Sequence, residues 1–224
     1  MRVVSWNANM KFREKWKILD NYYHADLYII QECEDPNQCE NKDYQNFASN
    51  SLWIGDMKSK GLGIFTPHDS TITRLSDESH YLRYMLPFEF EDKQFIGIWA
   101  CANHIEDLVV YLSINHALVK QRPIIMGDFN SSVIWNKKHK NRTHSVMNNM
   151  LQKENLMSAY HEITGDQQGK ENIATFYMYR HLNKPYHIDY CYCEPQSILN
   201  FEVGQYEFWY EYSDHMPIVI ELVD

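Results

Sequence analysis

The stretch Ile124-Ile125-Met126-Gly127-Asp128-Phe129-Asn130 places an apolar run directly before a glycine and two polar residues. The apolar run is typical of a buried strand that ends at Gly127. Because residues i and i+2 of an extended segment point to the same face, we expect Asp128 and Asn130 to project together. Such a carboxylate can align or deprotonate a water, and such an amide can donate a hydrogen bond to an oxyanion. An Asx turn that closes the strand is the alternative interpretation.

Composition sets bounds on the class of protein. The chain has 224 residues, of which 44% are hydrophobic and 23% charged, an ordinary globular balance. It contains no linker, repeat or low-complexity run, so we expect a single domain over residues 1–224. The formal net charge of −9 argues against tight nucleic-acid binding through general basicity. It leaves room for a local basic contact, or for an acidic site that is neutralised by metal.

Location and partners are predicted from what the sequence lacks. No charged-then-apolar leader and no run of membrane-spanning length is present, so we expect no membrane association. The five cysteines have no regular framework spacing, which is typical of a reduced, cytoplasmic protein. Cys191 and Cys193 would share one face of a strand as ordinary thiols. No obligate protein partner is indicated.

Hydrophobic periodicity predicts many strands and a few helices. Besides the strand before Asp128, strands are predicted near residues 2–6, 25–30, 52–54, 61–65, 70–75, 83–90, 94–102, 174–179, 187–193, 197–203 and 216–223, and helices over 11–23, 106–119 and 144–153. Pro87 breaks the alternation of its strand, which indicates a sheet edge or a bulge. The pattern favours an α/β (α+β) domain, a four-layer αββα sandwich in which two mixed β-sheets pack face to face with helices outside.

Polar residues recur where these apolar strands end or begin. They are Asn7, Glu32, the pair Asn103-His104, Asp128 with Asn130, Asp189, and Ser213-Asp214-His215. Strand ends are rigid mounts, so side chains from several of them can converge on one cleft. Each member alone is explained equally well as a turn or a surface pair. Together they predict an oxygen-rich site that suits magnesium or manganese better than zinc or copper.

The motifs, in order, are Ser5-Trp6-Asn7, Gln31-Glu32, Gly127-Asp128-Phe129-Asn130, His187-Ile188-Asp189-Tyr190 and Ser213-Asp214-His215. This ordered set resembles the endonuclease/exonuclease/phosphatase superfamily, and the resemblance spans essentially the whole chain. It implies a four-layer sandwich and magnesium-dependent hydrolysis of phosphoesters, with Mn²⁺ as a possible substitute.

The resemblance also implies roles for individual residues. Glu32 would bind the metal with help from Asn7 and Asp214, and Asp128 would align and activate the attacking water. Asn130 would hydrogen-bond the phosphate or that water.

His215, oriented by Asp189, would contact the scissile phosphate and stabilise its developing charge. Asn9 stands where some relatives place a further residue near the metal, and we group it with the residues that face substrate. His104 resembles the histidine of the pancreatic-type deoxyribonuclease and deadenylase branches. The tyrosine motif of the abasic-site endonuclease branch and the inositol phosphatase signature are absent, and His187 stands where many nucleases have arginine.

A basic loop at residues 135–142 follows the Asp128 motif. It is either a solvated loop or a contact for an anionic substrate through Lys137, Lys138 and Arg142. The leading hypothesis is therefore a magnesium-dependent phosphodiesterase that acts on nucleic acid. A phosphatase or phosphodiesterase for a small phosphorylated molecule is the alternative, and a non-catalytic binding module with the same fold is a third.

Overall fold

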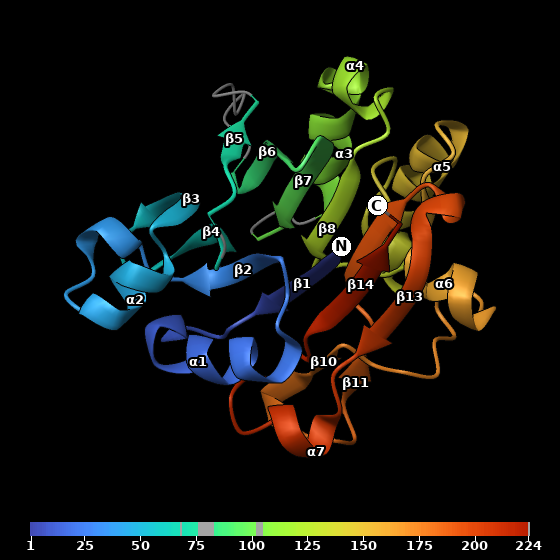
Figure 1. The fold of residues 1–224 in the computed structure, drawn as a ribbon. Coiled ribbons are helices and arrows are strands. Elements are labelled where there is room, and N and C mark those ends of the chain that lie inside the picture. Colours follow the sequence, from blue (N-terminus) through green and yellow to red (C-terminus); the bar gives the residue numbers. More distant parts are fainter. Residues whose placement is uncertain (68, 76–82, 102–104, 224) are drawn as a thin grey trace.

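The apolar strands build two six-stranded sheets that lie face to face, with helices on the two outer sides (Figure 1). The computed structural model describes the chain except residues 68, 76–82, 102–104 and 224. The first sheet has the order β13 (Ile198–Val203), β14 (Ile218–Leu222), β1 (Arg2–Asn7), β2 (Leu27–Cys33), β4 (Lys60–Thr66) and β3 (Asn50–Met57). The second has the order β5 (Ile72–Arg74), β6 (Met85–Phe90), β7 (Lys93–Trp99), β8 (Ile124–Asp128), β12 (Asp189–Cys193) and β9 (Met157–Ser158).

Each sheet is mixed and contains one parallel pair. β1 pairs with β2 in parallel in the first sheet, and β7 pairs with β8 in parallel in the second. The remaining pairs are antiparallel. The helices are α1 (Phe12–Tyr23), α2 (Lys42–Phe47), α3 (Ile105–Ile114), α4 (His116–Val119), α5 (His144–Lys153), α6 (Ala159–Thr164) and α7 (Tyr206–Trp209).

Short elements complete the chain. They are the two-stranded ladder of β10 (Phe176–Tyr177) and β11 (Pro185–Tyr186), and the 3₁₀ turns η1 (Pro36–Gln38), η2 (Val133–Lys138), η3 (Met178–Arg180) and η4 (Pro195–Ser197). No helix in the described part of the chain is long and apolar enough to cross a membrane.

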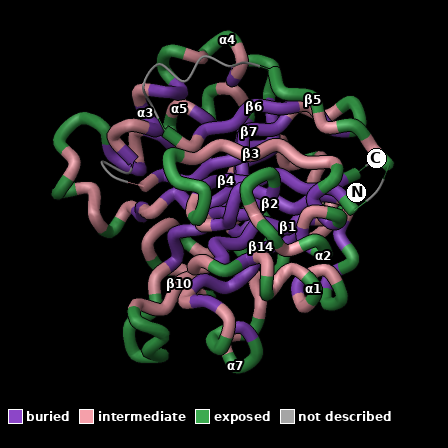
Figure 2. The backbone as a smooth tube through the Cα atoms, turned by 90° about the vertical axis from the view of Figure 1, so that its left-hand side faces the viewer, coloured by how far each residue is buried: buried purple, intermediate pink, exposed green. Residues whose placement is uncertain are grey.

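Three hydrophobic layers hold the sandwich together. Between the sheets, Val3 and Ile29 of the first sheet share a cluster with Phe88 and Met126 of the second. The outer face of the first sheet packs on α1, α2 and α7, and that of the second on α3 and α5. Each fully buried aliphatic or Phe side chain contributes roughly 1.5–3 kcal/mol relative to an exposed one. Figure 2 shows this buried backbone concentrated in the strands, with exposed segments around them.

The strand period explains where the polar strand ends lie. In β8, Ile124 and Met126 face the other sheet, whereas Ile125 faces the helices. Asp128 has the parity of Met126, so it lies at the end of the layer between the sheets. By the same alternation, the side chain of Asp189 lies on the same face of β12 as that of Cys191, which faces the layer between the sheets.

Gly127 is required at its position by a close approach of two strands. It has a φ of 151°, and a Cβ there would lie 1.9 Å from the carbonyl oxygen of Ile98 in β7. Ile98 is the parallel register partner of Gly127. A side chain would push β8 away from β7, so the glycine sets how Asp128 leaves the sheet.

Several predicted elements differ in detail. Residues 106–119 form two helices, because the Asn115 side chain bonds back to the Tyr111 carbonyl at 3.0 Å and the backbone there leaves the helix. The strand predicted at 174–179 shrinks to β10, since Tyr179 adopts a left-handed conformation. Pro87 is in neither an edge strand nor a bulge. β6 is the second strand of its sheet, and Pro87 pairs in register with Ile96 while its carbonyl accepts from Leu75 beyond the short edge strand β5.

Candidate active site

Two aspartates face each other at the end of the layer between the sheets. Asp128 of β8 and Asp189 of β12 are direct register partners in an antiparallel pair, so their side chains lie on the same face. Both are buried, with exposed fractions of 0% and 2%. Burial and mutual repulsion disfavour two ionised carboxylates in such a place unless a cation or donors compensate.

His215 supplies that compensation from the segment that precedes β14. Its Nδ1 lies 3.0 Å from Asp189 Oδ2 and 3.1 Å from Asp189 Oδ1, and its Nε2 lies 3.9 Å from Asp128 Oδ2. Burial lowers the pKa of His215, but the negative charges of Asp189 and Asp128 outweigh it and raise the pKa to about 10. The ring is therefore an imidazolium at neutral pH.

Asp128 has an unusually high proton affinity for a carboxylate. Burial raises its pKa, and Asp189 adds to the effect, whereas the charge of His215 and the amide of Asn7 oppose it. The Asn7 Nδ2 donates to Asp128 Oδ2 at 3.0 Å, and the backbone N–H of Asn130 donates to Oδ1 at 2.8 Å. Asn130 Nδ2 also donates to Oδ2 at 3.2 Å. A carboxylate with these properties is suited to accept a proton from water.

A second set of hydrogen bonds joins the segment after β1 and the segment before β14 to this cluster. The Asn9 backbone N–H donates to Asn7 Oδ1 at 3.0 Å, and Asn9 Nδ2 donates to Asp214 Oδ1 at 2.8 Å. Ser213 Oγ donates to the Asn7 carbonyl at 2.7 Å and accepts from the His215 N–H at 3.0 Å. The structure thus brings together most of the residues predicted for the site, namely Asn7, Asn9, Asp128, Asn130, Asp189, Asp214 and His215.

The loop after β1 has an uncommon backbone. Asn9, Met10 and Lys11 adopt positive φ values of 49°, 67° and 56° in succession. The left-handed conformation costs about 1–2 kcal/mol for each non-glycine residue, less for asparagine. Other contacts must therefore hold this loop in place, which is typical of segments that present functional side chains.

Glu32 reaches the same side of the molecule through a bulge in its strand. The alternation of side chains along β2 would point the Glu32 side chain away from the layer between the sheets. However, the register of β2 with β4 shifts between Gln31 and Cys33, and Glu32 has a φ of 57°. Its carboxylate lies 3.1 Å from the Lys60 ammonium, which lies 5.2 Å from the centroid of the Trp99 ring. A cation is thus already accommodated beside Glu32.

Several residues that support the site were not predicted from the sequence. Thr175 Oγ1 accepts from the backbone N–H groups of Ile188 and Asp189, both at 3.0 Å, and so fixes the start of β12. Trp6 Nε1 donates to the His215 carbonyl at 2.9 Å. The Phe176 ring lies 4.6 Å from that of His215. Trp6 belongs to a recognised motif, and Phe176 begins an aromatic stretch that does not by itself indicate a contact with His215; a single Thr carries no signal of its own.

Among the described residues, the predicted basic side chains do not join this network. His104 lies outside the described residues. Lys137 and Lys138 are exposed at the end of η2, and Arg142 is exposed beyond it. Lys138 Nζ lies 5.8 Å from the Trp135 ring centroid.

The buried trio is a candidate metal centre by geometry. One ligand atom from each of Asp128, Asp189 and His215 lies within 4.8 Å of the others, so the cluster could hold a metal ion. Coordination by His215 would require loss of its proton, which its raised pKa opposes. Glu32, Asn7 and Asp214 offer the hard oxygen ligands that Mg²⁺ prefers, and the Lys60 ammonium beside Glu32 indicates that a positive charge fits there.

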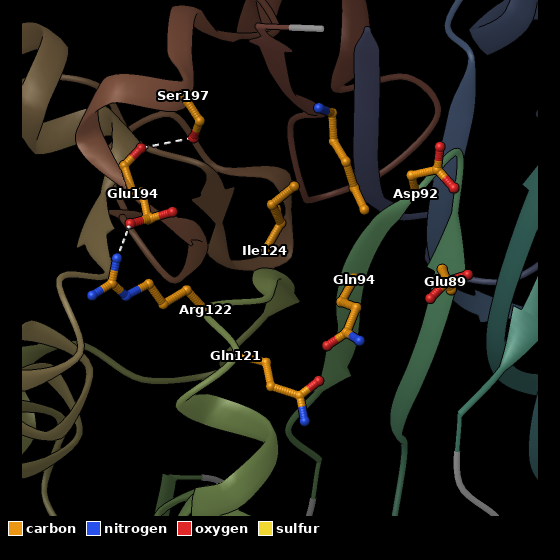
Figure 3. A pocket seen from close by; sticks show the side chains of 9 residues that line it. Glu89, Asp92, Gln94, Gln121, Arg122, Ile124, Glu194 and Ser197 are labelled. Atoms are coloured by element: carbon orange, nitrogen blue, oxygen red, sulfur yellow. Dashed lines mark hydrogen bonds and ion pairs between the residues drawn. The ribbon is translucent and has the colours of Figure 1, made fainter.

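A separate polar pocket lies at the other end of β8 (Figure 3). It is lined by residues such as Gln94, Gln121 and Ile124, and its wall includes the Arg122–Glu194 ion pair at 2.7 Å. Ile124 begins β8 and Asp128 ends it, so this pocket lies at the opposite end of the strands from the candidate site.

Comparison with known proteins identifies the fold. No protein-family model matches the chain, and the search of curated proteins gives no match. Solved structures do match. A 3′ phosphatase, NExo, from Neisseria bound to a product DNA hairpin has a TM-score of 0.74 at 13% identity, covering 100% of both chains. An AP endonuclease from Archaeoglobus fulgidus has a TM-score of 0.72 at 13% identity with the same coverage.

The chain has the fold of these enzymes. A 3′-5′ exonuclease, NExo, from Neisseria meningitidis also matches, with a TM-score of 0.67 at 15% identity and 99% coverage of both chains. The likeness confirms the predicted αββα sandwich of two mixed sheets.

The buried imidazolium predicts a stability that falls as pH rises. The pKa of His215 in the folded protein, about 10, lies above the ordinary value of 6.5. Its stabilising contribution is therefore fully present below pH 6.5 and is lost as pH rises through about 10. His215→Gln removes the titrating group, so its free energy of unfolding should fall less steeply with pH over this window. Urea unfolding checks this, with exposed His116→Gln as the control; parallel curves for wild type and His215→Gln would contradict it.

Proposed function

We propose that the chain is a metal-dependent phosphoesterase of the endonuclease/exonuclease/phosphatase superfamily that hydrolyses phosphodiester bonds in nucleic acid. The observation that carries this proposal is the joined network of Asn7, Asp128, Asp189 and His215 at the edge of the sandwich. Those residue types in that order belong to the motifs of the superfamily. The fold is shared with a 3′ phosphatase, a 3′-5′ exonuclease and an AP endonuclease.

Asp128 acts in this proposal as the base that aligns and deprotonates the attacking water. Its buried carboxylate already accepts from Asn7 and Asn130, so one oxygen is held in a defined direction. Asn130 Nδ2 can turn from Asp128 to the phosphate or the water. His215, oriented by Asp189, presents Nε2–H toward Asp128 and so toward the reacting phosphate, where a cation stabilises developing negative charge.

Glu32, Asn7 and Asp214 would hold Mg²⁺, or Mn²⁺ in its place. The bound ion would supply Lewis-acid stabilisation of a phosphoryl oxygen. Asn9, which holds Asp214 at 2.8 Å, would orient that carboxylate and face the substrate. Lys60 lies beside Glu32, where its ammonium can neutralise the carboxylate or turn to a substrate phosphate.

A row of neighbouring aromatic side chains favours nucleic acid over a small phosphoester as the substrate. Lys138 lies over Trp135, whose ring is 5.2 Å from Tyr186. Tyr186 is 6.2 Å from Phe176, which in turn contacts the His215 ring. Aromatic faces can stack successive bases, and basic groups beside them can follow the backbone. The alternative, a phosphatase or phosphodiesterase for a small phosphorylated metabolite or nucleotide, is favoured by the net charge of −9.

The proposed function is tested by a panel of labelled substrates. Duplex DNA with a 3′ phosphate, duplex DNA with an abasic site, single-stranded DNA, RNA and a small phosphodiester are incubated with Mg²⁺ or with chelator. We expect cleavage of a nucleic acid only with metal, and a loss of turnover of about 10²–10⁴-fold in Asp128→Asn. Glu32→Gln should raise the metal concentration that is needed for half-maximal cleavage. Asp92→Asn, on the β6–β7 turn, is the charge-matched control. Full activity in chelator would sink the proposal.

The role of the basic loop is tested by Lys137→Glu combined with Lys138→Glu. The Michaelis constant for the oligonucleotide should rise. The slope of log affinity against log salt concentration should become shallower by about 1 for each phosphate that the loop no longer neutralises. Turnover of the small phosphodiester should hold. Lys93→Glu with Lys120→Glu makes the same charge change at the other end of the sheet. Equal effects of the two double variants would leave the loop as a solvated surface and favour the small-molecule alternative.

A further inference from the structure

Lys15 is a cation whose hydrogen bonds all go to backbone oxygens next to the candidate site, and its Nζ lies 5.9 Å from the centroid of the Trp6 ring. It lies on α1, and its Nζ makes three short bonds, to the carbonyls of Ala8 at 2.6 Å, Met10 at 2.8 Å and Tyr212 at 2.6 Å, with the Asn9 carbonyl farther away at 3.5 Å. An ammonium has three N–H donors, so these bonds use all of them. Within the described chain, Lys15 forms no salt bridge with a carboxylate. It therefore has no donor left for a substrate.

The three carbonyls belong to segments from opposite ends of the sequence. Ala8 and Met10 lie in the loop after β1, and Tyr212 lies in the loop before β14. The first loop presents Asn7 and Asn9, and the second presents Asp214 and His215. Lys15 is thus bonded to both backbones that carry the network of the site.

Side-chain hydrogen bonds also join the two segments, one of them from Ser213 Oγ to the Asn7 carbonyl at 2.7 Å. The first loop has the run of left-handed residues described above; of these, Met10 directs its carbonyl to Lys15 at 2.8 Å, whereas the Lys11 carbonyl accepts from the Glu14 N–H. The side-chain bond of Asn9 to Asp214 crosses between the loops. Arg180 donates to the Glu211 carbonyl at 3.0 Å, a second cation that fixes the same C-terminal loop.

We propose that Lys15 is a positioning residue for the proposed metal site: by bonding Ala8, Met10 and Tyr212 at once, it fixes the separation of Asn7 and Asp214. The inference rests on the proposed function. Lys15 touches neither metal nor substrate and acts through the two loops. Loss of its three bonds frees the loops to move apart, so the ligands lose their arrangement while the two sheets, held by their own layers, remain.

The test compares Lys15→Met, which keeps the apolar stem and removes the donors, with Lys17→Met. Lys17 is on the same helix, and its ammonium is exposed and paired with Asp43 at 2.6 Å. Mn²⁺ affinity is measured by electron paramagnetic resonance on folded protein, below the melting temperature of every variant. We expect Lys15→Met to weaken Mn²⁺ binding by about 10- to 100-fold, the range for residues that orient metal ligands, and Lys17→Met to leave it unchanged.

Lys15→Arg keeps the charge but cannot direct three N–H groups from one atom, so its Mn²⁺ affinity should fall between wild type and Lys15→Met. It also provides the comparison if Lys15→Met is too unstable. A lower melting temperature with unchanged Mn²⁺ affinity would overturn the positioning role. If wild type binds no Mn²⁺, or Glu32→Gln binds it as well as wild type, the proposed metal site fails instead. The two failures are therefore distinguishable.

Discussion

The candidate site depends on one electrostatic constraint: two aspartates that are register partners are both buried. Asp128 and Asp189 cannot both carry charge in that position without a compensating cation. His215 provides it, with one ring nitrogen on Asp189 and the other facing Asp128. The histidine is thereby kept protonated, while Asp128 keeps a raised pKa. In the proposed function, the same arrangement would provide a cation for a phosphate and a carboxylate that can accept a proton.

The fold creates this constraint at little cost to its core. Along β8 and β12, each inward position before the site is apolar, and the aspartates occupy only the terminal position of that row. The site is therefore at the edge of the layer between the sheets. Because β1 and β14 are antiparallel neighbours, the last residue of β1 and the segment before β14 lie at the same end of the sheet, where Asn7 and His215 meet the aspartates. Thr175 and Ser213 then hold the local backbone in place.

Much of this arrangement was predictable because strands are short and periodic. Apolar runs that end in Asp or Asn pointed to Asp128 and Asn7, the motif that opens a strand pointed to Asp189, and the order of motifs supplied the fold. The sequence could not show that Asp128 and Asp189 are register partners, since pairing depends on tertiary structure. By strand alternation Glu32 falls on the helix-facing side of β2, and the register shift beside it could not be read from the sequence. Lys15 resembles any lysine of an amphipathic helix, because its acceptors are backbone carbonyls that carry no residue signature.

The charge constraint at the site can be tested on the His215 ring itself. Nitrogen-15 NMR of the ring, assigned by its disappearance in His215→Gln, reports the charge of the imidazole in metal-free protein as pH is raised. We expect the ring to remain an imidazolium well above the ordinary histidine pKa of 6.5 and to titrate near the raised pKa of about 10. Titration at or below 6.5, or a neutral ring throughout, would contradict the claim that His215 is the cation between two buried carboxylates.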